Sequence, residues 1–265
     1  MRNKFSKSVL AAGFGLAMIF TFSCASGSDD GSPSSGGGTS SSSGGGTSSP
    51  SGGNFEYGSM KDNNGKTYKT IEIGGQIWMA ENLDYNVSGS ECYGKDLAKC
   101  AIYGRLYDWK TAMKLPECNS DSCSSQINAN HQGICPDDWH IPSNEDWNKL
   151  LRYVDDDNDG IGSEFSGRYF SFTAGRYLKA AGWDSYDGKS DNSEDKYGFS
   201  ALPGGIANDY SGDFESIGVL GTWWSAHGSS GMFFAWDMIS GEDFVLSGLN
   251  REAGMSSVRC LKNEP

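Results

Sequence analysis

The clearest alternation of apolar and polar positions lies in the segment CPDDWHIPSNEDWNKLLRYV and predicts an amphipathic helix that starts after Ser143. Apolar side chains recur there at the i, i+3, i+4 and i+7 spacing of one buried helix face: Trp147, Leu150, Leu151 and Val154. Ser143 is a good N-cap, and Asp146 follows three residues later, as in a capping box. We therefore expect this helix to be one of the main elements of the fold.

Two weaker helical patterns lie before and after it. The stretch YGRLYDWKTAMKL places apolar residues at helical spacing ahead of Pro116: Leu106, Trp109, Ala112 and Met113. The stretch AGRYLKAAGW predicts a further short helix that stops at Gly182.

The other patterns indicate strands. KTYKTIEIGGQIWMAENL alternates around Gly74 and Gly75, and glycine tolerates the positive φ that a tight hairpin turn needs. After Gly160, glycines and aromatics alternate in short pieces such as GFSALPGG, GTWWSAH and GMFFAWDM, which is typical of short antiparallel strands. The predicted fold class is α+β, with two main helices against one side of a twisted antiparallel β half.

The start of the chain has the layout of an export signal. Three basic residues come first: Arg2, Lys4 and Lys7. The apolar stretch 9–22 is short for a transmembrane helix and suits a signal peptide, residues 1–23. Cys24 stands where the bacterial lipobox places its acylated cysteine, so we expect a lipoprotein held on the membrane by its N-terminal lipid. Plain secretion, without lipid on Cys24, is the alternative.

Composition divides the rest of the chain into a tether and a domain. Residues 24–53, which follow the predicted cleavage site, are rich in Gly, Ser and Thr and carry almost no side chain able to build a core, so we expect a disordered linker. Residues 54–265 are long enough for one sizeable domain. Loss of the signal takes the formal charge from −13 to about −16, which argues against nucleic acid or anionic lipid as a partner.

Six cysteines besides Cys24 indicate disulfides in an exported chain, although many pairings are possible in principle. Pairing of near neighbours, with the two remaining cysteines joined, gives three bonds: Cys92–Cys100, Cys118–Cys123 and Cys135–Cys260. A zinc site with His131 and His140 is the rival, but no C-x-x-C pair is present.

An acidic run, RYVDDDNDGIGSE, directly follows the predicted main helix. Its oxygen groups have the spacing of ligands in a helix–loop Ca²⁺ site: Asp155, Asp157, Asp159 and the carbonyl of Ile161. Ser166 stands where such a loop places its bidentate glutamate, so a solvated acidic loop is the alternative. Ca²⁺ is the one cofactor that the sequence suggests.

Several motifs occur together in the order seen in one known family: KTYKTIEIGGQIWMAENLDYN, YGRLYDWKTAM, GICPDDWHIPSNEDWNKLL, YGFSALPGG, WWSA and VRCLK. On these motifs the chain resembles the Fibrobacter succinogenes major paralogous domain, a module of bacterial lipoproteins and secreted proteins, over about residues 60–263. The molecular function of that family is not established, so the resemblance implies a location more than a mechanism.

The resemblance also implies a C-type-lectin-like fold, in which Cys135 of GICP and Cys260 of VRCLK sit where a long-range disulfide closes the domain. The calcium-dependent sugar site of such lectins uses an E-P-N or Q-P-D tripeptide and a W-N-D. This chain has neither tripeptide, and Trp236-Asp237-Met238 departs from W-N-D, so that site is not transferred.

Candidate catalytic groups are sparse. The chain has three histidines; His140, inside a family motif, is expected to be packed, while His227 is expected to face solvent. An enzyme of the formylglycine-generating branch of C-type-lectin-like proteins would need free cysteines, which three disulfides would not leave. We therefore expect a protein that is not an enzyme.

Aromatic residues crowd the predicted β half: Trp223, Trp224, Phe233, Phe234 and Trp236. Core filling accounts for any one of them, but in adjacent strand residues the side chains alternate faces, and we expect Trp224 to point outward. With Trp223, Trp236 and His227 it forms the candidate ligand-binding surface, since flat aromatic faces suit sugar rings.

The expected function is non-catalytic binding of glycan or plant-fibre polysaccharide in adhesion, by a lipoprotein of the outer membrane that is exposed at the cell surface. A periplasm-facing position is the alternative location. A protein-interaction or structural envelope module, with an envelope protein as partner, is the alternative function.

Overall fold

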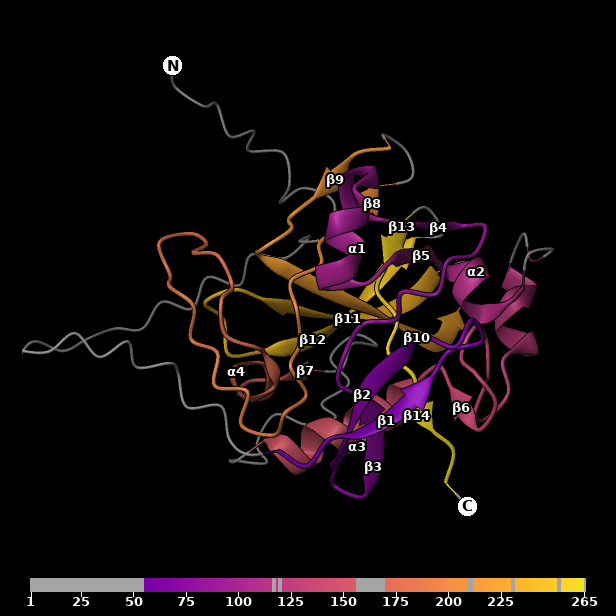
Figure 1. Cartoon of the computed structure of the whole chain (residues 1–265), viewed down its shortest axis with the longest axis horizontal. Coiled ribbons are helices and arrows are strands. Elements are labelled where there is room, and N and C mark those ends of the chain that lie inside the picture. The colour runs from indigo at the N-terminus through magenta and orange to yellow at the C-terminus, as the bar shows by residue number, and fades with distance from the viewer. Residues whose placement is uncertain are drawn as a thin grey trace, which may run out of the picture. The chain divides into compact units, whose positions relative to one another are not determined.

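The computed structural model of the chain describes residues 55–115, 118, 121–155, 170–208, 212–229, 232–251 and 254–264 (Figure 1). These residues belong to one compact unit, Pro50–Pro265. The predicted signal peptide and linker, including Cys24, lie outside the described residues.

The strands form three sheets, in which every pair of neighbouring strands is antiparallel. The first has the order β1 (Gly58–Lys61), β2 (Thr67–Ile73), β3 (Gln76–Met79), β14 (Leu261–Lys262), β6 (Trp139–His140). The second has the order β10 (Leu220–Ser229), β11 (Met232–Ile239), β12 (Val245–Arg251), β7 (Phe170–Ser171). The third has the order β4 (Ser90–Glu91), β5 (Leu106–Asp108), β13 (Gly254–Ser256), β8 (Ile206–Asn208), β9 (Phe214–Glu215).

The described part of the chain holds four α-helices: α1 (Leu97–Tyr103), α2 (Trp109–Met113), α3 (Asn144–Val154) and α4 (Ala174–Leu178). Two 3-10 turns accompany them, η1 (Tyr93–Lys95) and η2 (Asp121–Gln126). The predicted mixture of helices and antiparallel strands is confirmed, but the strands occupy three sheets instead of one, and the structure is mostly sheet.

The main predicted helix and its cap are confirmed in α3. Ser143 Oγ accepts a hydrogen bond from Asp146 N at 3.2 Å, and Asp146 Oδ2 accepts one from Ser143 N at 2.8 Å, which completes the capping box. The four predicted apolar residues of its inner face are buried.

The other two helices are shorter than predicted. Leu106 belongs to strand β5, and α2 begins only at Trp109, because Asp108 caps it by accepting from Thr111 N at 2.7 Å. Helix α4 ends before Gly182, since Lys179 leaves the helical conformation and bridges to Ala201.

The predicted hairpin is confirmed between β2 and β3. Ile73 pairs with Gln76 across a turn made by Gly74 and Gly75, which have φ of 59° and 78°. An L side chain rarely adopts this conformation at two successive positions, so the Gly-Gly pair accounts for the tight turn.

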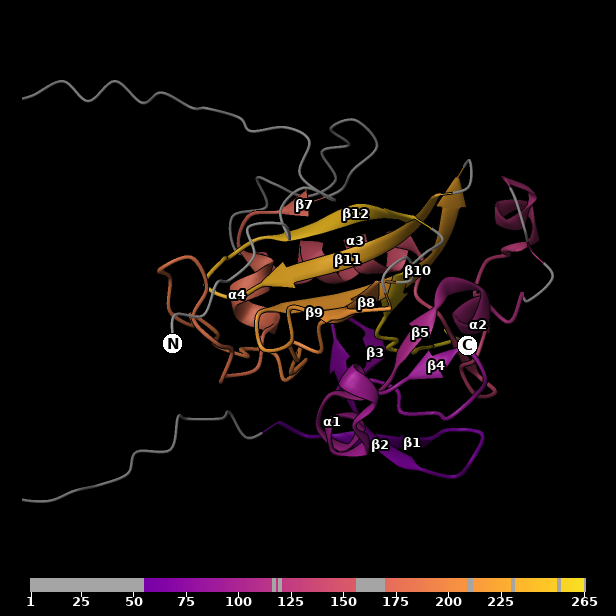
Figure 2. The ribbon, with the colours of Figure 1, turned by 90° about the horizontal axis from the view of Figure 1, so that it is seen from above.

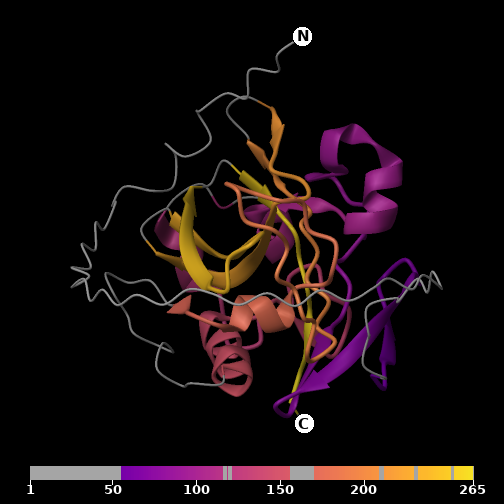
Figure 3. The same cartoon turned by 90° about the vertical axis from the view of Figure 1, so that its left-hand side faces the viewer.

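The sheet of β10, β11 and β12 is covered on both faces. Trp223 pairs across strands with Trp236, and both lie in a cluster with the inner faces of α3 and α4. Trp224 points the other way and lies in a second cluster with Trp109 of α2. Figure 2 shows these strands side by side, and Figure 3 shows the curled sheet with α3 and α4 along it.

The disulfide pairings are confirmed. The structure joins Cys92 to Cys100, Cys118 to Cys123 and Cys135 to Cys260. Because all six cysteines are oxidised, the zinc alternative is wrong. The third bond spans 125 residues and ties Cys260, the residue directly before strand β14, to the loop before β6.

Candidate ligand-binding pocket

The tryptophans predicted to bind a ligand are part of the core. Trp224 is 1% exposed, so the prediction that its ring points outward is wrong, and Trp223 and Trp236 are equally enclosed. Strand alternation does send Trp223 and Trp224 to opposite faces, but helices and loops cover both faces.

The polar edges of these rings are also satisfied inside the protein. Trp223 Nε1 donates to Asn82 Oδ1 at 2.8 Å, and Trp224 Nε1 donates to Tyr107 O at 2.6 Å. Trp236 Nε1 donates to the side-chain oxygen of Asn144 at 3.1 Å. A ring whose indole N–H is already paired in the interior serves packing, and these three side chains form no ligand surface.

The other predicted site residues are dispersed. His227 is exposed, as expected, and its ring packs edge-on against Phe234 with centroids 4.8 Å apart. Asp155 caps α3 and turns inward, where it accepts from Ser171 Oγ at 2.7 Å and Thr173 Oγ1 at 2.6 Å. Its carboxylate thus already binds two hydroxyl groups.

The rest of the predicted calcium site lies outside the described residues: Asp157, Asp159 and Ile161. Within the described residues, no group of three or more His, Cys, Asp or Glu side chains is placed to hold a metal ion. The part of the chain that the structure describes also holds no helix long and apolar enough to cross a membrane.

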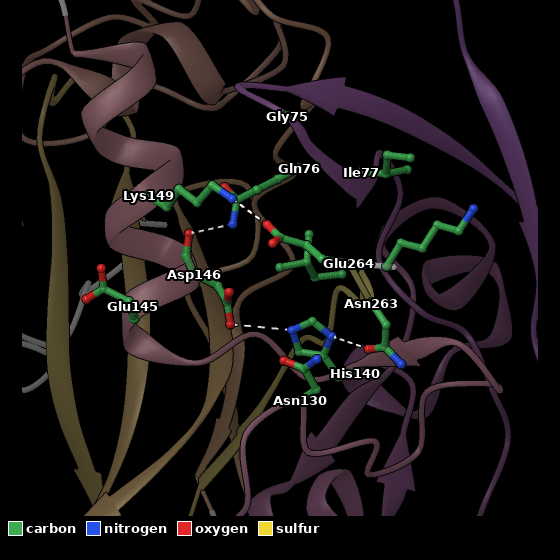
Figure 4. Close-up of a pocket in the computed structure, with 12 residues that line it drawn as sticks. Gly75, Gln76, Ile77, Asn130, His140, Glu145, Asp146, Lys149, Asn263 and Glu264 are labelled. Atoms are coloured by element: carbon green, nitrogen blue, oxygen red, sulfur yellow. Dashed lines mark hydrogen bonds and ion pairs between the residues drawn. The ribbon is translucent and has the colours of Figure 1, made fainter.

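A pocket of about 470 Å³ opens between the β2–β3 turn, the first turns of α3 and the segment after β14 (Figure 4). Most of the residues that line it have polar or charged side chains: Gln76, Asn130, His140, Glu145, Asp146, Lys149, Lys262, Asn263 and Glu264. Ile77 and Leu261 add apolar surface. Four stretches of the chain, residues 75–77, 130, 140–149 and 261–264, thus contribute groups to one pocket.

His140 is held between two oxygen acceptors at the base of this pocket. Its Nδ1 lies 2.7 Å from Asn263 Oδ1, and its Nε2 lies 3.4 Å from Asp146 Oδ2 (Figure 4). Both ring nitrogens thus face a side-chain oxygen atom, which fixes the orientation of the imidazole.

Asp146 links the helix cap to the pocket. Burial alone would raise its pKa, but hydrogen bonds from His140 and Ser143 outweigh burial and hold the pKa of Asp146 below its ordinary value of 3.8. Ser143 Oγ donates to Asp146 Oδ2 at 2.6 Å and not to His140. The three side chains therefore lack the hydrogen bond from hydroxyl to imidazole that an activated serine needs.

The rim of the pocket carries one ion pair, and an aromatic ring lies one helical turn further along α3. Lys149 Nζ lies 2.5 Å from Glu264 Oε1, with both side chains well exposed. Tyr153 follows one helical turn after Lys149, and its ring packs against Gly74, the neighbour of the pocket residue Gly75. The ring of Tyr153 is 57% exposed and also packs edge-on against Tyr197, with centroids 5.8 Å apart.

The fold and the pocket define a disulfide-stapled, β-rich domain with a polar surface site. A sequence profile described as the Fibrobacter succinogenes major domain matches residues 71–262, and the chain belongs to this family. No curated protein and no solved structure matches the chain.

Only part of the pocket could be predicted from the sequence. His140 and Asp146 lie six residues apart, and the sequence pattern indicates only the capping role of Asp146. Asn263 follows His140 by 123 residues and comes into place because β14 pairs with β6. Such a long-range pairing cannot be read from local patterns.

Proposed function

We propose that this protein is a non-catalytic lipoprotein of the outer membrane, anchored through Cys24, whose folded domain binds glycan at the cell surface. The proposal includes a C-type-lectin-like relationship for the fold, but it places the ligand in the pocket beside α3 and not on the tryptophans of the β half. The observation that carries it is the pocket itself.

The chemistry of the lining suits a polyhydroxylated ligand. Amide groups donate and accept hydrogen bonds with sugar hydroxyls, and carboxylates accept them; the pocket offers the amides of Asn130 and Asn263 and the carboxylate of Glu145. The apolar surface of Ile77 and Leu261, with the exposed ring of Tyr153 nearby, suits the C–H faces of a sugar ring. Positive and negative groups are mixed, so no single ionic ligand class is favoured.

The test is retention of the purified chain on insoluble cellulose and on a panel of immobilised glycans. The diagnostic variant is Lys149→Met, which removes the rim ion pair of the pocket. Lys66→Met is a matched control, because Lys66 forms an ion pair of the same 2.5 Å length with Asp84 and the two lysine side chains are 45% and 46% exposed.

Retention of the wild-type chain and of Lys66→Met, with weaker retention of Lys149→Met, supports the proposal. Flow-through of the wild-type chain on every polysaccharide contradicts it and leaves a protein-interaction or structural envelope role as the better account. Equal retention of all three chains would support glycan binding but move it away from this pocket.

A further inference from the structure

A buried lysine and an asparagine meet at the end of helix α4, away from the pocket. Lys179 is fully buried, and its Nζ donates to Asn192 Oδ1 at 2.8 Å. It also donates to the backbone oxygens of Ile239 at 3.0 Å and Glu242 at 2.7 Å. The amine is therefore confined to one position, with the Asn192 carboxamide as its only side-chain hydrogen-bond acceptor among the bonds described.

The orientation of that carboxamide is set from both sides. Its oxygen faces the Lys179 amine, and its Nδ2 donates to Asp243 Oδ1 in a short contact. A flipped amide would place donor against donor at Lys179 and acceptor against acceptor at Asp243. The carbonyl carbon of Asn192 thus lies between an amine and a carboxylate.

The surrounding backbone holds these three groups together. Asp191 accepts hydrogen bonds from the backbone N–H groups of Gly182, Trp183 and Ser193, which closes the loop that carries Asn192. Gly175 N donates to Asp243 O at 2.7 Å, which fixes the β11–β12 turn against α4. Positioning of this kind raises the effective concentration of reacting groups by orders of magnitude.

We propose that Lys179 and Asn192 form an intramolecular amide bond, assisted by Asp243, which covalently closes the loop after α4. The neutral amine at Nζ attacks Cγ of Asn192, the bond between Cγ and Nδ2 breaks, and ammonia leaves. The proton lost from Nζ ends on the departing nitrogen, and Asp243, hydrogen-bonded to Nδ2, is the group in place to relay it. The atoms balance without an oxidant, reductant or added reagent.

Two further features favour attack by the Lys179 amine over a lysine that remains a protonated ammonium. Burial lowers the pKa of Lys179 to about 8, against the opposing pull of Asp191, Asp243 and Glu242, so a sizeable fraction of the amine is neutral near physiological pH. The ring of Trp183 lies 5.4 Å from Nζ and helps to keep bulk water from the site. Exclusion of water protects the carboxamide from hydrolysis while the amine attacks.

The experiment is mass spectrometry of the purified full-length chain after reduction of its disulfides. The reference is the Lys179→Arg chain processed in the same way, because arginine keeps the positive charge and its donors but cannot form this amide. After correction for the substitution, the wild-type chain should be lighter by one ammonia. Peptide mapping should recover a branched peptide that joins Lys179 to Asn192.

Asp243→Ala should slow or abolish the mass loss while leaving both reacting groups present. A wild-type chain at its full sequence mass would overturn the proposal and leave Lys179 as a hydrogen-bonded ammonium. A mass deficit that maps to a succinimide at Asn192, or to any other residue, would overturn it as well. The wild-type measurement decides the matter even if the variants fold poorly.

Discussion

The guanidinium of Arg259 donates through Nε to the side-chain oxygen of Asn82 at 2.9 Å, inside the protein. The same oxygen accepts from Trp223 Nε1, and Arg259 also donates to the backbone oxygens of Phe199 and Ser200. Four of the motifs noted in the sequence meet here: AENL, YGFSALPGG, WWSA and VRCLK. These stretches therefore contribute side chains to the interior of the domain.

Replacement of Asn82 by alanine should destabilise the domain strongly. Trp223 Nε1 and the Arg259 Nε would lose their shared acceptor in the interior, and we expect a loss of about 3 kcal/mol in the free energy of unfolding. Denaturant unfolding measures the change. Asn64→Ala, in an exposed turn, is the control and should stay within about 0.5 kcal/mol of wild type.

Whether a feature of this fold can be predicted from the sequence depends on how far apart in the chain its interacting residues lie. Local rules were sufficient for α3, because Ser143 and Asp146 cap it and its apolar face has one spacing. They were also sufficient for the Gly74-Gly75 hairpin and for the cysteine pairs close in sequence. Each of these features is determined by residues near one another in the chain.

Features that depend on tertiary contacts were missed. The alternation of side chains along a strand correctly sends Trp223 and Trp224 to opposite faces of the sheet. It does not show that α2 and the residues packed with it cover the second face. The strand character of Leu106 depends on pairing with β4 and β13. The pocket needs the segment after β14 beside α3, and no local pattern brings Asn263 to His140.

The long-range disulfide should stabilise the domain more than the local ones. Loop-closure entropy predicts about 5 kcal/mol for the 125-residue separation of Cys135 and Cys260, against about 2 kcal/mol for the five-residue separation of Cys118 and Cys123. Paired Cys→Ser variants of each bond, compared by denaturant unfolding, test the difference. A larger loss from the Cys118–Cys123 variant would contradict this account.

Asp146 should make the domain sensitive to acid. Its pKa is lowered in the folded state, chiefly because hydrogen bonds from His140 and Ser143 outweigh burial, so the stabilisation is complete above its ordinary value of 3.8 and is lost as pH falls through the lower folded value. Asp146→Asn keeps the shape and an acceptor for the helix cap but does not titrate. Below about pH 4, wild-type stability should therefore fall more steeply than that of the variant. Equal slopes in urea unfolding across this range would contradict the assignment.

The exposed ring beside the pocket provides the sharpest test of the proposed ligand. Tyr153 and Phe172 are each 57% exposed, but Tyr153 packs against Gly74, the neighbour of the pocket residue Gly75, and lies one turn from Lys149 in α3. If a sugar face stacks on Tyr153, Tyr153→Ala should weaken polysaccharide binding by about 1 kcal/mol, roughly fivefold in Kd. Phe172→Ala should leave the affinity unchanged, and Tyr153→Phe should retain most of it. Affinity electrophoresis in gels containing soluble polysaccharide measures all three. Equal losses from the two alanine variants would show that the pocket side of α3 has no special part in binding.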